Sequence, residues 1–259
     1  MDLGLKGRRA LVTGSSAGLG AAAAMALAQE GVEVVINGRD LKRLEKTAAS
    51  IHSATGVSPR LSVGDISRAD DISKIVQTAG EIDILVSNGG GPPPGDVADH
   101  PAERWQEAGE LVLHSAISLT RAVIGGLKER GWGRLIYITS IGVLQPVDSL
   151  ILSNTFRAGV TAFCKTISNN YAQYGITANC VCPGYTATER LSQLAGKLSE
   201  DSDRTAGEVM AGFATACPSR RIGKPQELAA LIAFLASDRA AYITGTSIPV
   251  DGGLNKALI

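Results

Sequence analysis

Short apolar runs alternate along the chain with longer alanine- and leucine-rich segments of helical period. The short runs contain little polar alternation and end in Gly, Asn or Asp, which is typical of strands buried on both faces. Strands are predicted at residues 10–13, 33–37, 60–65, 82–88, 134–140, 176–182 and 247–250. Helices are predicted at residues 18–29, 41–51, 69–79, 103–129, 155–174 and 225–236. This order predicts an α/β protein with a doubly wound parallel sheet covered by helices on both faces.

Two segments interrupt the alternation. Residues 89–94 read Gly-Gly-Gly-Pro-Pro-Pro directly after a predicted strand, and residues 185–223 form a long polar stretch before the last helix. Ligands of open α/β sheets bind outside the carboxyl ends of the strands, so both segments are expected to border a site. No repeat or linker divides the chain, and we expect one domain over residues 1–259 with a lid-like insertion at about 186–219.

Composition narrows the class of protein further. Of 259 residues, 44% are hydrophobic, and 25 basic residues balance 25 acidic ones, so a nucleic-acid partner is not expected. No stretch approaches the roughly 20 apolar residues of a membrane span, and the N-terminus lacks the apolar run of a signal peptide. The four cysteines show no metal-ligand spacing, so we expect no metal site, reduced thiols and a cytoplasmic location.

A glycine turn follows the first predicted strand and opens the first predicted helix. Gly14 suits a tight turn, Gly18 allows the backbone to approach a pyrophosphate, and Gly20 allows the helix to pack on the sheet. The N–H groups at the start of the helix favour phosphate binding. This context predicts a dinucleotide site, whereas the alternative is a glycine turn without a ligand.

The end of the second predicted strand distinguishes NAD from NADP. An acidic residue there would bind the ribose hydroxyls of NAD, but the chain has Gly38 followed by Arg39. Arg39 could bind a 2′-phosphate, which predicts a preference for NADP(H). The alternative is that Arg39 is a solvated surface residue.

Further motifs follow in order along the chain. They are Asp65-Ile66, Ser87-Asn88-Gly89-Gly90, Ser140 at the end of a strand, the run 179–184 (Asn-Cys-Val-Cys-Pro-Gly), Ile243-Thr244-Gly245 and Val250-Asp251-Gly252-Gly253. With the glycine turn, this ordered set resembles the short-chain dehydrogenase/reductase family, of the 3-oxoacyl carrier-protein reductase type, over essentially the whole chain.

The resemblance implies where a cofactor would lie. Asp65 and Ile66 would hold the adenine, residues 88–90 the adenosine ribose side, and residues 183–188 the nicotinamide amide. The expected cofactor-binding residues are Gly14, Ser16, Gly18, Leu19, Gly20, Asn37, Gly38, Arg39, Asp65, Ile66, Asn88, Gly89, Gly90, Arg157, Pro183, Gly184, Thr186 and Thr188. The resemblance also implies a homotetramer or homodimer, built through the helices at 103–129 and 155–174 and through residues 250–259.

The family's catalytic Asn, Ser, Tyr and Lys are not all matched. Ser140 matches the serine, but Ser153 stands at the tyrosine position, Arg157 at the lysine position, and Val112 near the asparagine position. A serine hydroxyl is a far poorer acid than a phenol, and a guanidinium stays protonated and cannot relay protons. We therefore expect Ser140, Ser153 and Arg157 to form an altered catalytic site.

Several alternatives stay open at this point. Ser140 could only cap a turn, and Arg157 could pair with a surface acid rather than with the nicotinamide ribose or a substrate carboxylate. His114 and Tyr185 are the nearest other proton donors in the sequence. The favoured function is an NADP(H)-dependent oxidoreductase acting on a small-molecule carbonyl or alcohol. The alternative is a non-redox protein of the same fold: a lyase, an isomerase, or a nucleotide-binding or structural subunit.

Overall fold

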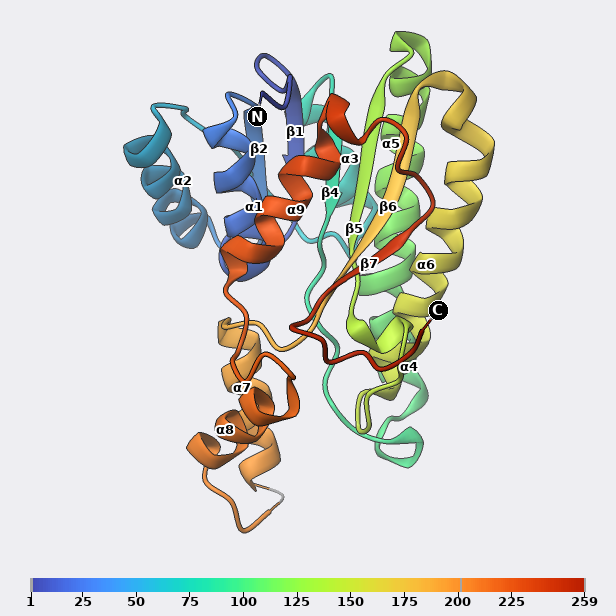
Figure 1. Cartoon of the computed structure of the whole chain (residues 1–259). Coiled ribbons are helices and arrows are strands. Elements are labelled where there is room, and N and C mark those ends of the chain that lie inside the picture. The colour runs from blue at the N-terminus through green and yellow to red at the C-terminus, as the bar shows by residue number, and fades with distance from the viewer. Residues whose placement is uncertain (1, 201, 259) are drawn as a thin grey trace.

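The computed structural model describes residues 2–200 and 202–258, and its centre is one parallel sheet (Figure 1). The strand order is β3-β2-β1-β4-β5-β6-β7, and every neighbouring pair is parallel. The strands are β1 (Arg9–Val12), β2 (Glu33–Gly38), β3 (Arg60–Val63), β4 (Ile84–Ser87), β5 (Gly133–Ile138), β6 (Ile176–Pro183) and β7 (Ser247–Val250). All seven predicted strands are confirmed, with ends that differ by a few residues.

Helices cover both faces of the sheet. They are α1 (Gly18–Gln29), α2 (Leu41–Thr55), α3 (Ala69–Ala79), α4 (Ala102–Gly109), α5 (Ser115–Arg130), α6 (Ile151–Tyr171), α7 (Glu189–Glu200), α8 (Ala206–Ala216) and α9 (Pro225–Ala236). Apolar residues of α1, α2 and α9 form one core against the sheet, and those of α3, α5 and α6 form the other. The predicted doubly wound architecture is therefore confirmed.

The predicted helix at 103–129 is not a regular helix throughout. It consists of α4 and α5 joined by a π-helical turn at Glu110–His114. The whole stretch Ala102–Arg130 is long and apolar enough to cross a membrane. However, Leu119, Val123 and Leu127 of α5 pack in the core beneath the sheet, which accounts for its hydropathy.

The helices differ from the sequence predictions at two further places. Helix α6 begins at Ile151, four residues before the predicted Thr155, so Ser153 lies in its first turn. The segment expected to be a polar lid contains two helices, α7 and α8, which project below the carboxyl ends of the strands in Figure 1. Their few buried residues, such as Leu191 and Phe213, form a small core separate from the two cores that pack on the sheet.

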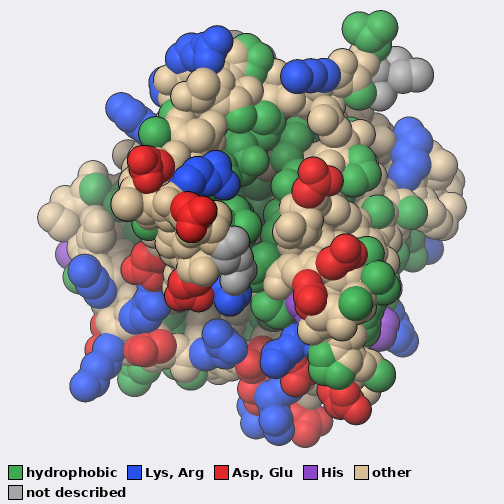
Figure 2. Space-filling view, turned by 90° about the horizontal axis from the view of Figure 1, so that it is seen from below, with side chains coloured by type: hydrophobic (Ala, Val, Ile, Leu, Met, Phe, Trp, Pro, Cys, Tyr) green, Lys and Arg blue, Asp and Glu red, His purple; other side chains and the backbone are tan. Residues whose placement is uncertain are grey.

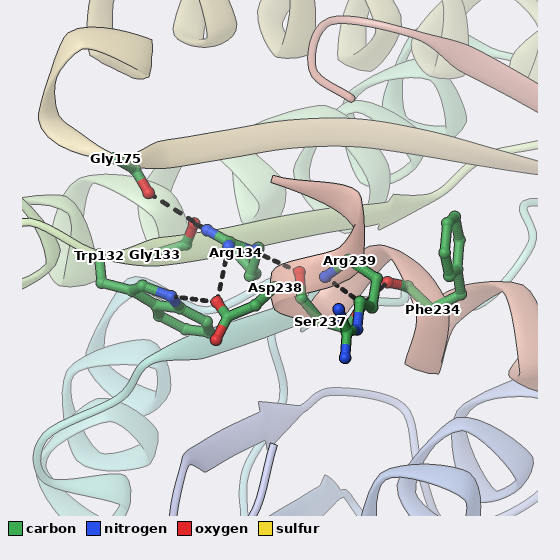
Figure 3. Close-up of polar contacts among 8 residues, drawn as sticks. All are labelled: Trp132, Gly133, Arg134, Gly175, Phe234, Ser237, Asp238 and Arg239. Carbon is green, nitrogen blue, oxygen red and sulfur yellow. Dashed lines mark hydrogen bonds and ion pairs between the residues drawn. The ribbon is translucent and has the colours of Figure 1, made fainter. Parts of the chain in front are cut away.

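A buried arginine, Arg134 of β5, links several elements by hydrogen bonds at the amino end of the sheet (Figure 3). Its guanidinium donates to the carbonyls of Gly133, Gly175 and Ser237, at 2.9, 3.2 and 3.3 Å, and pairs with Asp238 at 3.3 Å. Burial, offset in part by Asp238, lowers the pKa of Arg134 from its ordinary value. The network joins β5 to the start of β6 and to the end of α9, at the opposite end of the sheet from the cleft described below.

Candidate active site

A cleft of about 560 Å³ opens at the carboxyl ends of the strands. The loops after β1, β2, β3, β4, β5 and β6 line it, together with the first two turns of α6 and α7. Figure 2 shows the molecule from this side, with hydrophobic side chains gathered in a hollow and charged side chains of both signs around it. This is the edge of the sheet at which the sequence predicted a ligand.

The glycine turn after β1 is fixed by contacts with the loop after β4. Gly14 has a φ of +55°, and a Cβ at this position would lie 2.5 Å from the carbonyl oxygen of Asn88. The side-chain amide of Asn88 donates to the Gly14 carbonyl at 3.0 Å, and its backbone N–H donates to the Thr13 hydroxyl at 2.9 Å. Only glycine fits at residue 14, and the two loops form one unit.

The start of α1 is open towards the cleft. Its N-cap residue, Ala17, provides no side-chain cap, so the first N–H groups of the helix have no side-chain acceptor there. Gly18 has a φ of +57°, and a Cβ there would lie 3.5 Å from the Thr188 side chain. A side chain at residue 18 would therefore narrow the space that a pyrophosphate needs, so this turn fits a dinucleotide.

Gly20 does not line the cleft, although the sequence placed it among the cofactor-binding residues. A Cβ at residue 20 would lie 2.4 Å from the Gly14 carbonyl oxygen. The absence of a side chain at Gly20 allows α1 to pack closely, which is the role that the sequence predicted for this glycine.

The end of β2 is crowded around Gly38. A Cβ on Gly38 would lie 3.1 Å from Cβ of Ser16 and 3.4 Å from the Leu44 side chain. Arg39 follows, with 79% of its side chain exposed, and its only ion pair among the described residues is a long one of 3.6 Å to Asp65. The structure therefore leaves an exposed cation at the position where the sequence predicted a phosphate contact.

Asp65 is held ionised by its surroundings. Burial would raise its pKa, but hydrogen bonds from the Ser67 amide and hydroxyl, together with the charge of Arg39, lower the pKa below its ordinary value of 3.8. Asn37 plays a structural part, because its side chain donates to the carbonyls of Ser62 and Gly64 at 3.0 and 3.1 Å. It joins β2 to the end of β3 at the floor of the cleft.

Ser140 follows β5 and caps the short helical turn at Ile141–Val143. Its hydroxyl oxygen accepts from the backbone N–H of Gly142 at 3.1 Å. An accepting hydroxyl keeps its own proton free, so the capping role leaves Ser140 able to donate to a ligand in the cleft.

Arg157 lies at the bottom of the cleft and has 9% of its surface exposed. It donates through Nη1 to the Ile138 carbonyl at 2.8 Å, through Nη2 to the Gly90 carbonyl at 3.4 Å, and through Nε to the Ser153 hydroxyl at 3.2 Å. The structure gives it no carboxylate partner within residues 2–200 and 202–258. The alternative of a surface ion pair for Arg157 is therefore wrong.

Burial, and then the charge of Arg190, lowers the pKa of Arg157 to about 10. The guanidinium therefore stays charged near neutral pH, and its Nε–H bond leaves the proton of Ser153 free to point away from it.

Arg190, in the first turn of α7, was not predicted from the sequence. It is exposed at the rim of the cleft and donates through Nη2 to the Pro92 carbonyl. No motif marks it, because its proximity to Arg157 depends on the position of α7 and of the loop at residues 89–94.

Three other residues considered in the sequence have different roles. Val112 is buried in the core, and the neighbouring Leu111 lines the cleft instead. His114 does not line the cleft; it is exposed and pairs with Glu110 at 3.2 Å. Tyr185 does line the cleft, but it stacks on Phe213 at 4.3 Å and burial raises its pKa, so it is a poor acid.

The segment after β6 closes the far side of the cleft. Pro183, Gly184, Thr186 and Thr188 all line it. The Thr188 hydroxyl accepts from the Leu191 N–H at 3.3 Å at the start of α7. The Thr186 hydroxyl donates to the Gly184 carbonyl at 3.2 Å. The structure brings all the predicted cofactor-binding residues except Gly20 to this one cleft.

Comparison with known proteins identifies the family. The profile described as enoyl-(acyl carrier protein) reductase matches residues 14–255. The chain is 32% identical to the bovine dehydrogenase/reductase SDR family member 4, over 96% of this chain and 88% of that protein. The chain belongs to the short-chain dehydrogenase/reductase family of oxidoreductases.

Solved structures of this family superpose closely on the chain. The L-sorbose reductase of Gluconobacter frateurii, in complex with NADPH and L-sorbose, has a TM-score of 0.94 and 32% identity, with 100% of both chains covered. A variant of actinorhodin polyketide ketoreductase with NADPH has a TM-score of 0.91 and 30% identity, over 96% of this chain and 98% of that chain.

Proposed function

We propose that this protein is an NADP(H)-dependent oxidoreductase that interconverts a carbonyl and an alcohol, with the family's catalytic serine retained as Ser140 and with Ser153 and Arg157 in place of the tyrosine and lysine. The observation that carries the proposal is the single cleft, which has an open glycine turn at one end and these three polar residues at the other. The NADPH complexes of sorbose reductase and of the polyketide ketoreductase support the choice of cofactor.

A bound NADPH would supply a hydride, which forms a C–H bond at the carbonyl carbon while the π electrons of the C=O bond move to oxygen. The side chains of the protein must then stabilise the charge that develops on this oxygen. Among the described residues the hydroxyls of Ser140 and Ser153 only accept hydrogen bonds, so each can donate its proton to a ligand, and Arg157 adds a fixed positive charge within hydrogen-bond distance of Ser153.

The proton that completes the alcohol comes from water through a serine hydroxyl. Neither serine is a strong acid, and Arg157 cannot release a proton near neutral pH, so these residues polarise the carbonyl and guide the proton but do not store it. We therefore expect slower turnover than a Tyr–Lys pair would give in the same cleft.

The preference for NADP(H) is supported by the end of β2. Gly38 provides no acidic side chain to bind the ribose of NAD, its surroundings are crowded, and Arg39 is exposed and only weakly paired. The glycine turn supplies the pyrophosphate site for either cofactor, so Arg39 decides the choice between them.

The direct test is oxidation of NADPH by a panel of ketones, aldehydes and oxo acids, followed at the absorbance of the reduced nicotinamide. Turnover by the wild-type protein that falls about 100-fold or more in Ser140→Ala, with unchanged NADPH binding, supports the proposal. Tight NADPH binding without turnover of any carbonyl or alcohol would contradict it and favour the non-redox alternative.

A further inference from the structure

The two arginines of the cleft, Arg157 and Arg190, differ from its other cations. Arg39 pairs with Asp65, and Arg43, near the mouth, pairs with Glu189 at 2.6 Å. Arg157 and Arg190 have only neutral partners within the described part of the chain. The two acids that line the cleft, Asp65 and Glu189, are thus already paired elsewhere.

The loop after β4 contacts both guanidinium groups, which lie close enough for the charge of Arg190 to act on Arg157. Arg157 is bonded to the Gly90 carbonyl and Arg190 to the Pro92 carbonyl. Between them, a Cβ on Gly91 would lie 2.8 Å from Nε of Arg190. The loop therefore holds both cations against the cleft from two different helices, α6 and α7.

Two like charges in this position are unfavourable without a counter-ion. Arg157 is nine-tenths buried, and a buried charge is normally paired. Of its five N–H groups, three are used by Ile138, Gly90 and Ser153, which leaves one on each Nη atom. Two N–H groups on adjacent nitrogens match the two oxygens of a carboxylate.

We infer that Arg157 and Arg190 together bind the carboxylate of an oxo acid substrate, or of the matching hydroxy acid in the reverse direction. The inference rests on the proposed oxidoreductase function. The phosphates of the cofactor are expected beside the glycine turn after β1, whereas this pair lies where β4 and β5 end, so the substrate is the closer source of the anion.

The same geometry limits the length of the substrate. The three nitrogens of the Arg157 guanidinium share one carbon atom, and one of them, Nε, contacts Ser153. A carboxylate on the Nη atoms therefore lies close to a carbonyl polarised by Ser153. Oxo acids with the carbonyl at position 2 or 3 fit this arrangement, and those with a more distant carbonyl fit it less well.

The test compares four isomers, 2-, 3-, 4- and 5-oxohexanoate, each with its methyl ester, as substrates with NADPH. For the wild-type protein we expect the 2- or 3-oxo acid to exceed its ester by about tenfold or more in kcat/KM. In Arg190→Gln the acid should lose about 10- to 100-fold while the ester changes little, and Arg190→Lys should recover part of the loss.

Two further variants separate binding from folding. Gly91→Ala keeps Arg190 but displaces its flexible end, so it should reduce the preference for the acid as well. Arg204→Gln removes an exposed cation between α7 and α8 with the same change in charge, and it should leave the preference intact. Equal use of acid and ester by the wild-type protein, or an equal loss of both in Arg190→Gln, would overturn the inference.

A binding measurement distinguishes this failure from failure of the proposed function. The NADPH complex is titrated with 3-oxohexanoate, its methyl ester or inorganic phosphate, and its thermal stability is recorded. If only the acid raises the thermal stability, and Arg190→Gln abolishes this effect, the carboxylate site is supported. If the same protein turns over no carbonyl or alcohol, the proposed oxidoreductase function fails although the carboxylate site stands. Turnover of neutral carbonyls with no effect of the acid, or with an effect of phosphate only, would overturn the carboxylate site while the oxidoreductase function stands.

Discussion

At the scale of single residues, Arg39 is the side chain that should decide cofactor choice. It is exposed and bonded only loosely to Asp65, so it can turn to a 2′-phosphate without breaking a strong contact. We predict that Arg39→Ala weakens NADPH binding about 10- to 100-fold and leaves NADH binding nearly unchanged.

The fluorescence of the bound reduced nicotinamide measures both affinities. Lys42→Ala, which removes an exposed cation from the nearby helix α2, is the matched control and should affect neither cofactor. Equal weakening of NADPH and NADH in Arg39→Ala would show that Arg39 does not bind the 2′-phosphate.

The pair Ser153 and Arg157 provides a second test at this scale. The double variant Ser153→Tyr with Arg157→Lys introduces a phenol and an ammonium one helical turn apart in the same cleft. We predict that reduction of neutral carbonyls increases about tenfold or more, because a phenol beside an ammonium can donate a proton near neutral pH.

The rate with NADPH in the double variant and in the wild-type protein decides this point. If the double variant folds and binds NADPH but its rate of carbonyl reduction does not increase, the cleft does not place a carbonyl beside residue 153.

At the scale of secondary-structure elements, Arg134 fastens β5 to β6 and α9. We predict that Arg134→Met lowers the free energy of unfolding by about 2–4 kcal/mol, because it removes four hydrogen bonds of a charged group at a buried site. Affinity for NADPH should not change, since this network lies at the other end of the sheet.

Denaturant unfolding measures the loss, with Arg239→Met as an exposed control expected to cost less than about 1 kcal/mol. If Arg134→Met is as stable as the wild-type protein, packing of the aliphatic part of this side chain, rather than its charge, stabilises the amino end of the sheet.

The start of α9 predicts a response to pH. Glu227 accepts both Arg221 Nη groups, at 2.7 and 2.5 Å, and the N–H of Lys224 at 2.7 Å, and these bonds lower its pKa from 4.5 to about 2. Its ionised form is therefore favoured in the folded state, and its contribution to stability is complete above pH 4.5.

This contribution is lost as the pH falls from about 4.5 to about 2. The wild-type protein should exceed Glu227→Gln in stability at neutral pH, and the difference should shrink across that range, as measured by urea unfolding at several pH values. Glu45→Gln, an exposed carboxylate on α2, serves as the control. A difference that does not depend on pH would contradict the assigned role of Glu227.

Across the whole molecule, the sequence was sufficient to predict the strands of the sheet but not all of the helices around it. The strands are buried on both faces, so nearly every position in them is apolar and the pattern is unambiguous, as in Leu11 and Leu85. Helices α7 and α8 pack mainly on each other and bury few residues, so no long apolar stripe marked them as helices in the sequence.

Part of the candidate site could likewise be predicted from the sequence, and part of it could not. The glycine turn has a local signature, because the positive φ angles at residues 14 and 18 favour glycine and the spacing of glycines is visible in the sequence. The part played by Arg190 is set by the packing of α7 beside the loop at residues 89–94, which no local pattern records. Likewise, only the fold shows that His114 lies away from the cleft and that Arg157 has no acidic partner in the described residues.

The most direct test of the account is a fluorescence titration of the wild-type protein with NADPH and, separately, with NADH. The open turn at Gly14–Gly20, the crowded Gly38 and the exposed Arg39 predict saturable binding of both, with NADPH about tenfold or more tighter. Binding of neither cofactor, or tighter binding of NADH, would contradict the proposal that this cleft serves an NADP(H)-dependent oxidoreductase.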